Sequence, residues 1–223
     1  MTLYLKAGPD GTSVGDCPFA HFVRLVLEEK GLDYTVQPCT AETKPNWLVE
    51  HYQGKMPALR HRKECYTESG VIADYLEFFF PEPSLQVAVK TSSSGVTTPT
   101  IDGSSVLEGF FPVVAQYIKA PEGQDEEQLR ALQEKLVALN QHFVNSSVSF
   151  VEGDSMSLSD CRLLPQLYHL QTAIEGFKQG IPNIQDSYPQ VYAYYERCAS
   201  RPSFQATIYP KDTVLWGWGN ARK

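Results

Sequence analysis

One cysteine, Cys17, stands where the chain enters a predicted helix. It follows Gly15 and Asp16, it precedes Pro18, and an apolar helical pattern then continues to Leu27. Proline suits the first turn of a helix, where its missing N–H has no partner to lose. The amides of that turn and the positive end of the helix dipole favour an anion, and a thiolate is such an anion. We therefore expect Cys17 to be a nucleophile that is more acidic than free cysteine.

The residue three positions after Cys17 decides which thiol chemistry is open to it. A dithiol redox motif needs a second cysteine there, and this chain has Ala20. An oxidised Cys17 must therefore be resolved by a thiol from outside, which indicates a small thiol co-substrate. The remaining cysteines lack this context and are interpreted as small buried hydrophobic residues: Cys39, Cys65, Cys161 and Cys198.

The composition is that of an ordinary globular chain. Of the 223 residues, 42% are hydrophobic and 20% are charged, and the formal net charge of -7 argues against a nucleic-acid partner. Five cysteines without disulfide-framework spacing indicate a reducing compartment. No apolar run reaches the ~18 residues of a membrane span. Because the N-terminus begins directly with a strand-like segment, we expect a cytoplasmic location, with a plastid left open, and no membrane partner.

Strand and helix patterns alternate over residues 1–82. The expected strands are 2–6, 34–37, 58–60 and 65–67, and the expected helices are 17–30, 47–52 and 69–79. This alternation, with a hairpin and a last helix at its end, is typical of a small α/β layer domain.

The rest of the chain has a different character. Residues 83–102 are rich in proline, serine and threonine and are predicted to be a linker. Beyond them, apolar residues recur every three or four positions over 129–143, and Ser157 with Asp160 forms a capping-box-like helix start. Residues 103–223 are therefore predicted to be an all-helical domain.

These features in this order resemble the glutathione transferase superfamily, in which a thioredoxin-like α/β domain precedes an all-α domain. The similarity is greatest to plant-type dehydroascorbate reductases, and it extends over nearly the whole chain. The matching segments are Lys6-Ala7, Gly15 to Phe19, Leu27 to Lys30, Lys44-Pro45-Asn46-Trp47, Gly54 to Pro57, Glu68 to Ile72, Leu167-Tyr168-His169 and Gly217-Trp218.

The resemblance implies a function as well as a fold. It predicts glutathione-dependent reduction of dehydroascorbate to ascorbate by Cys17, through sulfenate and glutathione mixed-disulfide intermediates. Glutathione is then a co-substrate, no cofactor is bound permanently, and the protein is a monomer. No metal is expected, because Cys17 and His21 lack further ligands at suitable spacing.

The resemblance places Lys6 and Asp16 beside Cys17, in contact with both dehydroascorbate and glutathione. Lys6 favours the thiolate and can hold an oxygen-rich substrate. A carboxylate beside a thiol raises the pKa of the thiol. We therefore expect Asp16 to orient the substrate or to relay protons.

The remaining implied residues contact glutathione. Met56-Pro57 resembles the cis-proline turn that binds the cysteinyl part, although Pro57 taken alone is more often an ordinary turn proline. Glu68 and Ser69 begin a helix whose hydroxyl and amides can hold the γ-glutamyl carboxylate, and Ser69 alone is simply an N-cap. Three further contacts are implied, each of which is otherwise a common structural or surface residue: Lys44, His169 and Trp218.

Two alternative functions share the Cys-Pro-Phe motif. One is an omega-type glutathione-dependent thiol transferase. The other is a chloride intracellular channel-like protein that inserts into membranes, although charged residues such as Arg24 and Lys30 interrupt the segment that would insert. The chain also lacks the Arg-Pro-Lys tail of the plant reductases, so a substrate contact from that tail is not transferred to Ala221.

Overall fold

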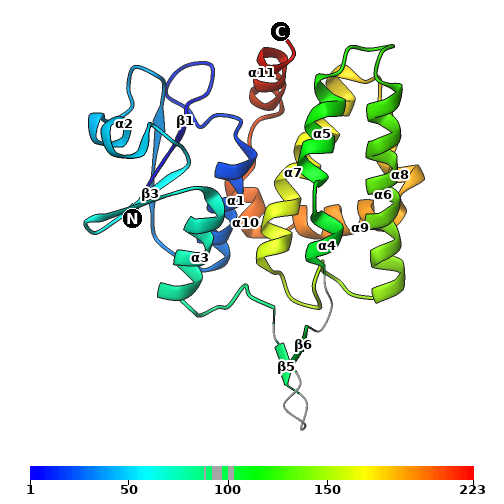
Figure 1. Ribbon diagram of the computed structural model, residues 1–223, viewed down its shortest axis with the longest axis horizontal. Helices are drawn as coiled ribbons and strands as arrows, with labels where there is room; N and C mark the ends of the chain where they lie inside the picture. The colour runs from blue at the N-terminus through cyan, green and yellow to red at the C-terminus, as the bar shows by residue number, and fades with distance from the viewer. Residues whose placement is uncertain (88, 92–96, 100–102) are drawn as a thin grey trace. The chain divides into compact units, whose positions relative to one another are not determined.

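The computed structural model describes residues 1–87, 89–91, 97–99 and 103–223 (Figure 1). The chain divides into two compact units. The first comprises Met1–Ser84 and Pro202–Asn220, and the second comprises Leu85–Arg201 and Ala221–Lys223.

The first unit is built on a sheet. Its strands are β1 (Thr2–Lys6), β2 (Thr35–Cys39), β3 (Ala58–His61) and β4 (Glu64–Thr67), in the order β2-β1-β3-β4. β1 is parallel to β2 and antiparallel to β3. Side chains alternate along β1, so that Leu3 and Leu5 enter the core. The predicted strands are confirmed, but β2 continues through Pro38, which an edge strand tolerates because the missing N–H breaks no ladder in the sheet interior.

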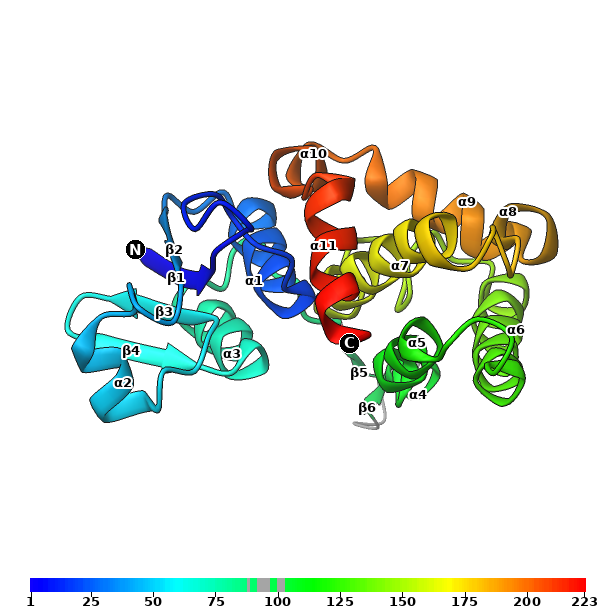
Figure 2. The same cartoon turned by 90° about the horizontal axis from the view of Figure 1, so that it is seen from above.

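The helices α1 (Pro18–Glu29) and α3 (Ser69–Phe79) pack against each other, and α2 (Asn46–Tyr52) lies away from them (Figure 2). The core face of α1 is fully buried and consists of Phe22, Val23, Leu25, Val26 and Leu27. A buried ion pair of 2.8 Å joins the Lys30 ammonium, after α1, to the Glu77 carboxylate on α3. Lys30 also donates a hydrogen bond of 2.7 Å to the carbonyl of Pro83.

Two helices from the end of the chain complete this unit, namely α10 (Pro202–Thr207) and α11 (Lys211–Ala221) except for its last residue. α10 packs on α1, where Nε2 of His21 lies 3.1 Å from Oγ1 of Thr207. Arg24 donates a hydrogen bond of 2.8 Å to the carbonyl of Thr207. The packing thus groups residues 202–220 with the α/β layer rather than with the preceding helices. The predicted domain boundaries remain a prediction.

The second unit is mainly helical. Its helices are α4 (Ser104–Leu107), α5 (Phe110–Lys119), α6 (Glu126–Ser146), α7 (Leu158–Phe177), α8 (Ile184–Ser187) and α9 (Pro189–Ala199). The apolar stripe predicted on α6 is confirmed from Leu132 to Phe143, both of which are buried. The capping box of α7 is also confirmed, with the Ser157 amide 2.8 Å from the Asp160 carboxylate. Among the described helices, none has the length and apolar character needed to cross a bilayer.

Part of the predicted linker 83–102, namely residues 88, 92–96 and 100–102, lies outside the described residues. Its described part was expected to be irregular, but it contains the strands β5 (Val89–Thr91) and β6 (Thr97–Pro99). These strands pair in antiparallel register.

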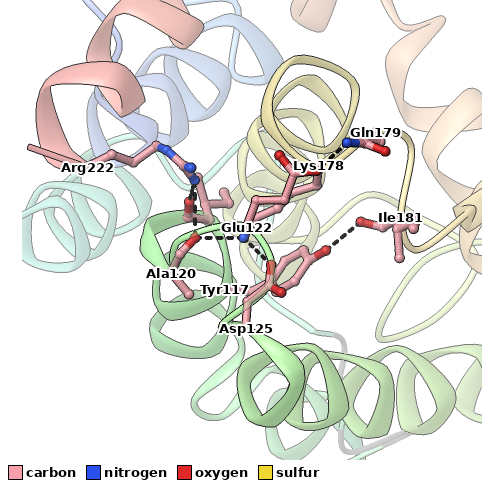
Figure 3. A network of polar contacts seen from close by, with 9 residues as sticks. Tyr117, Ala120, Glu122, Asp125, Lys178, Gln179, Ile181 and Arg222 are labelled. Atoms are coloured by element: carbon pink, nitrogen blue, oxygen red, sulfur yellow. Dashed lines mark hydrogen bonds and ion pairs between the residues drawn. The ribbon is translucent and has the colours of Figure 1, made fainter.

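A polar network fixes the end of α5 within the second unit (Figure 3). Lys178 is only 3% exposed, donates a hydrogen bond of 2.8 Å to the Ala120 carbonyl and pairs with Asp125. Arg222 donates to the carbonyls of Ile118 and Ala120. These cations satisfy backbone acceptors at the negative end of α5. The guanidinium of Arg222 is therefore engaged by α5.

Candidate active site

Gly15 brings the loop after β1 back onto the end of that strand. Its amide donates a hydrogen bond of 2.8 Å to the carbonyl of Lys6. A Cβ at Gly15 would lie 2.5 Å from that oxygen and 2.7 Å from the carbonyl oxygen of Ala7. Only glycine permits so close a backbone approach. The contact places Asp16 and Cys17 beside the end of β1.

Cys17 occupies the N-cap of α1, and Pro18 is the first helical residue, as predicted. The residue is half-buried, and burial raises the pKa of its thiol above the ordinary value. Hydrogen bonding to the amides of Ala20 and Phe19 lowers the pKa, the charge of Asp16 raises it, and the charge of Lys6 lowers it. The expectation of a thiol more acidic than free cysteine is therefore wrong, because lost hydration outweighs the helix N-terminus. Cys17 is held as a thiol that must lose its proton when it reacts.

Lys6 and Asp16 form an ion pair, with the Lys6 Nζ 2.6 Å from the Asp16 Oδ1. The Lys6 side chain is 46% exposed and that of Asp16 is 14% exposed, so water screens the pair on one side only. The other Asp16 oxygen rests against the backbone of α11, where a Cβ at Gly217 would lie 1.7 Å from Oδ2. The glycine therefore makes room for the carboxylate.

A cavity of about 340 Å³ lies at the same end of β1. Its lining residues are Lys6, Ala7, Gly8, Pro9, Gly11, Cys39, Thr40, Ala41, Lys44, Met56 and Trp216. It thus brings together three predicted glutathione contacts, Lys6, Lys44 and Met56, whereas Cys17 is not among the described lining residues. With two lysines in its lining, the cavity favours an anionic ligand.

Both segments that the resemblance assigns to glutathione, at Met56-Pro57 and at Glu68-Ser69, lie in the first unit. The Met56–Pro57 peptide bond is cis, as predicted. The N-cap of α3 is Glu68, with Ser69 as the first helical residue, so the interpretation of Ser69 as an N-cap is wrong. Glu68 adopts a φ of 68° and forms an exposed ion pair of 3.0 Å with Lys55. The glutathione contacts of these residues remain a prediction.

The two predicted contacts from the helices near the C-terminus are both buried. His169 lies on α7 in the second unit, where burial lowers its pKa to about 3, so the imidazole is neutral at physiological pH. Trp218 lies on α11 and is 7% exposed. The tryptophan that lines the cavity is Trp216, two residues earlier.

Sequence reasoning missed three residues of this site. Trp216 lines the cavity, Gly217 accommodates Asp16, and the Tyr209 hydroxyl donates a hydrogen bond of 3.2 Å to the Cys17 carbonyl. The Trp-Gly-Trp run was a visible signal, but it does not tell which ring faces the cavity. The prediction that the other cysteines are buried is confirmed for Cys39, Cys161 and Cys198, whereas Cys65 is half-buried. Within the described part of the chain, no three His, Cys, Asp or Glu side chains are placed to share a metal ion.

The charge of Asp16 gives the site a testable pH dependence. Because this carboxylate raises the pKa of the Cys17 thiol, we expect Asp16→Asn to lower that pKa and to speed alkylation by iodoacetamide at neutral pH. Lys6→Met should shift the pKa in the opposite direction. The pH profile of alkylation, mapped to Cys17 by peptide mass, measures both shifts. An upward shift in Asp16→Asn would contradict this electrostatic description.

A thioredoxin-like α/β layer with a cysteine at the first helix start, followed by a helical unit, is the architecture of glutathione transferases. Two family models match the chain: "Glutathione S-transferase, N-terminal domain" over residues 16–77, and "Glutathione S-transferase, C-terminal domain" over residues 104–202. The chain belongs to the glutathione S-transferase family.

Its sequence relatives include proteins that carry the name DHAR, and a similar solved structure is that of a dehydroascorbate reductase. The chain is 32% identical over 206 residues to glutathione S-transferase DHAR2 of Arabidopsis thaliana, covering 92% of this chain and 90% of that protein. It is 33% identical to the probable cytosolic glutathione S-transferase DHAR1 of Oryza sativa, with the same coverage. The crystal structure of Chlamydomonas reinhardtii dehydroascorbate reductase superposes with a TM-score of 0.81 at 27% identity, over 98% of this chain and 97% of that one. These findings confirm the resemblance to plant-type dehydroascorbate reductases.

The similarity also reaches a protein of another class. The chain is 29% identical over 194 residues to human chloride intracellular channel protein 3, covering 80% of this chain and 79% of that protein.

Proposed function

We propose that this protein reduces dehydroascorbate to ascorbate with glutathione, and that Cys17 is the nucleophile. The observation that carries the proposal is a cysteine at the N-cap of α1 with Ala20 in the place of a second thiol. It directly follows Asp16, which pairs with Lys6, and Lys6 lines the cavity together with Lys44. The similarity to dehydroascorbate reductases supports the same substrate.

The proposed cycle has three steps. The Cys17 sulfur attacks dehydroascorbate and loses its proton, and water supplies the oxygen as ascorbate leaves, so that the sulfur becomes a sulfenic acid and the substrate gains two electrons and two protons. One glutathione thiol then condenses with the sulfenic acid, releasing water and forming a mixed disulfide. A second glutathione attacks that disulfide, releases oxidised glutathione and restores the Cys17 thiol.

The charged groups have distinct parts in this scheme. With the pKa of the thiol raised by burial, Asp16 is suited to relay the proton that leaves the sulfur. Lys6 is suited to hold the oxygen-rich substrate, and Lys44, on the cavity wall, to bind a carboxylate of glutathione. The backbone at Met56 and the start of α3 at Glu68 and Ser69 supply the other glutathione contacts.

An omega-type thiol transferase would use the same cysteine and the same mixed disulfide. The two functions are therefore distinguished by their preferred substrate. We expect kcat/KM for dehydroascorbate to exceed that for a glutathionylated small-molecule disulfide by about ten-fold or more. Ascorbate formation at 265 nm and glutathione oxidation, each measured over a range of substrate concentrations, provide the comparison. A preference for the mixed disulfide would overturn the proposal. A cytoplasmic monomer remains our prediction.

A further inference from the structure

Trp216 on α11 lies against the Lys6 ammonium of the candidate active site. The Lys6 Nζ lies 5.0 Å from the centroid of the Trp216 ring, and Trp216 is only half-buried. The same nitrogen lies 2.6 Å from the Asp16 Oδ1. The ammonium is therefore held by a ring and by a carboxylate, two contacts from separate segments of the chain.

This arrangement has a physical consequence for a lysine at an open site. A lysine side chain has several rotatable bonds, and fixing it requires contacts that oppose the loss of conformational entropy. At 46% exposure, the surroundings alone do not confine the Lys6 side chain. A cation over the face of an indole is attracted by the negative potential of the ring, and tryptophan provides the strongest such attraction.

The position of the ring sets it apart from its neighbour Trp218. Trp218 is 7% exposed and belongs to the core, whereas Trp216 lines the cavity together with Lys6 and Lys44. Trp216 thus contacts the cation and also closes one side of the space that a ligand would occupy.

We propose that Trp216 is a positioning residue of this site, which holds the Lys6 ammonium beside Asp16 so that an oxygen-rich substrate meets a fixed cation. The identity of the substrate rests on the proposed function, whereas the positioning role does not. Trp216 contacts the Lys6 ammonium, which would bind the substrate. Any influence of Trp216 on the Cys17 sulfur is therefore exerted through Lys6.

The kinetic test replaces the ring in two ways. Trp216→Leu removes the cation–π contact and should raise KM for dehydroascorbate about two- to five-fold, with kcat within about two-fold of the native value. Trp216→Phe retains an aromatic face and should keep most of the native KM. Trp47→Leu is a matched control, because Arg60 lies over the Trp47 ring at 5.1 Å in the same unit and neither residue is among those described as lining the cavity. A Trp216→Leu variant with native KM, or a kcat loss alone, would overturn the positioning role.

A second readout needs no dehydroascorbate. The charged groups that act on the Cys17 thiol are Asp16 and Lys6. The phenol of Tyr209, whose pKa burial raises, hydrogen-bonds to the Cys17 carbonyl. Because the charge of Lys6 lowers the pKa of the thiol, Trp216→Leu should raise that pKa, in the same direction as Lys6→Met.

The double variant separates positioning from a general structural effect. If Trp216 acts through Lys6, then Lys6→Met combined with Trp216→Leu shifts the alkylation profile no further than Lys6→Met alone. Additive shifts, or an unchanged profile in Trp216→Leu, would overturn the inference. If the native protein fails to reduce dehydroascorbate, the proposed function is wrong. The comparison of alkylation profiles among the two single variants and the double variant still decides the role of Trp216.

Discussion

Replacing Cys17 with serine is expected to lower glutathione-dependent ascorbate formation by about 10³-fold or more. A serine hydroxyl keeps its proton at neutral pH and forms neither a sulfenic acid nor a disulfide. The α1 N-cap should remain intact, because serine is a favoured N-cap residue and its hydroxyl can accept hydrogen bonds from the same first-turn amides. Stability should therefore be preserved. Initial rates, together with thermal unfolding of both proteins, measure this contrast.

The other thiols of the first unit provide the controls. Cys39 borders the cavity, and Cys65 is half-buried on β4. Burial raises the pKa of both thiols, and neither stands at a helix start. We expect Cys39→Ser and Cys65→Ser to keep most of the native activity. Substantial activity in Cys17→Ser, or loss of activity in either control, would indicate that a cysteine other than Cys17 is the nucleophile.

Gly217→Ala is the second variant with a large expected effect. The added methyl group would meet the Asp16 Oδ2 at 1.7 Å and the Asp16 Cγ at 2.2 Å, so the carboxylate has to leave its position. The ion pair with Lys6 is then lost or displaced. Because misplacing a group by about 1 Å can cost ~10²-fold in rate, we expect activity to fall by about 10- to 100-fold. Steady-state kinetics measure this loss.

Gly219 offers a matched control on the same helix. A Cβ at this position meets nothing within 4 Å. Gly219→Ala should therefore stabilise the protein by about 0.5–1 kcal/mol, the usual gain of alanine over glycine in a helix, without changing activity. Gly217→Ala should gain less stability and lose activity, as measured by urea unfolding and initial rates. Equal activity in the two variants would show that the position of Asp16 does not matter for the reaction.

Much of the first unit could be predicted from local sequence signals. The alternation in Thr2–Lys6 and the helical pattern after Cys17 depend on residues close in sequence, and both elements form where expected. In the second unit, the capping box at Ser157 likewise depends on residues close in sequence. The hairpin of β3 and β4 also follows from its own residues, because its strands flank a tight turn.

The parts that escaped prediction depend on contacts between distant segments. The pKa of Cys17 depends on the burial that the fold imposes on its thiol, which the helix start alone does not reveal. Trp216 and Gly217 reach β1 and Asp16 only because α11 packs with the first unit. The helical periodicity of the sequence does not show which of Trp216 and Trp218 lines the cavity and which is buried. The pKa of Cys17, the identity of the tryptophan that lines the cavity and the packing of the last two helices therefore all depend on tertiary structure.

The most direct test of the central claim is the intact mass of the native protein, treated first with dehydroascorbate and then with a single equivalent of glutathione. The mixed disulfide adds about 305 Da, one glutathione less two hydrogens. We predict that this mass appears only after both treatments, maps to the peptide that holds Cys17, and disappears with excess glutathione. An adduct on Cys39 or Cys65, or no adduct while ascorbate still forms, would contradict a cycle carried by the Cys17 sulfur.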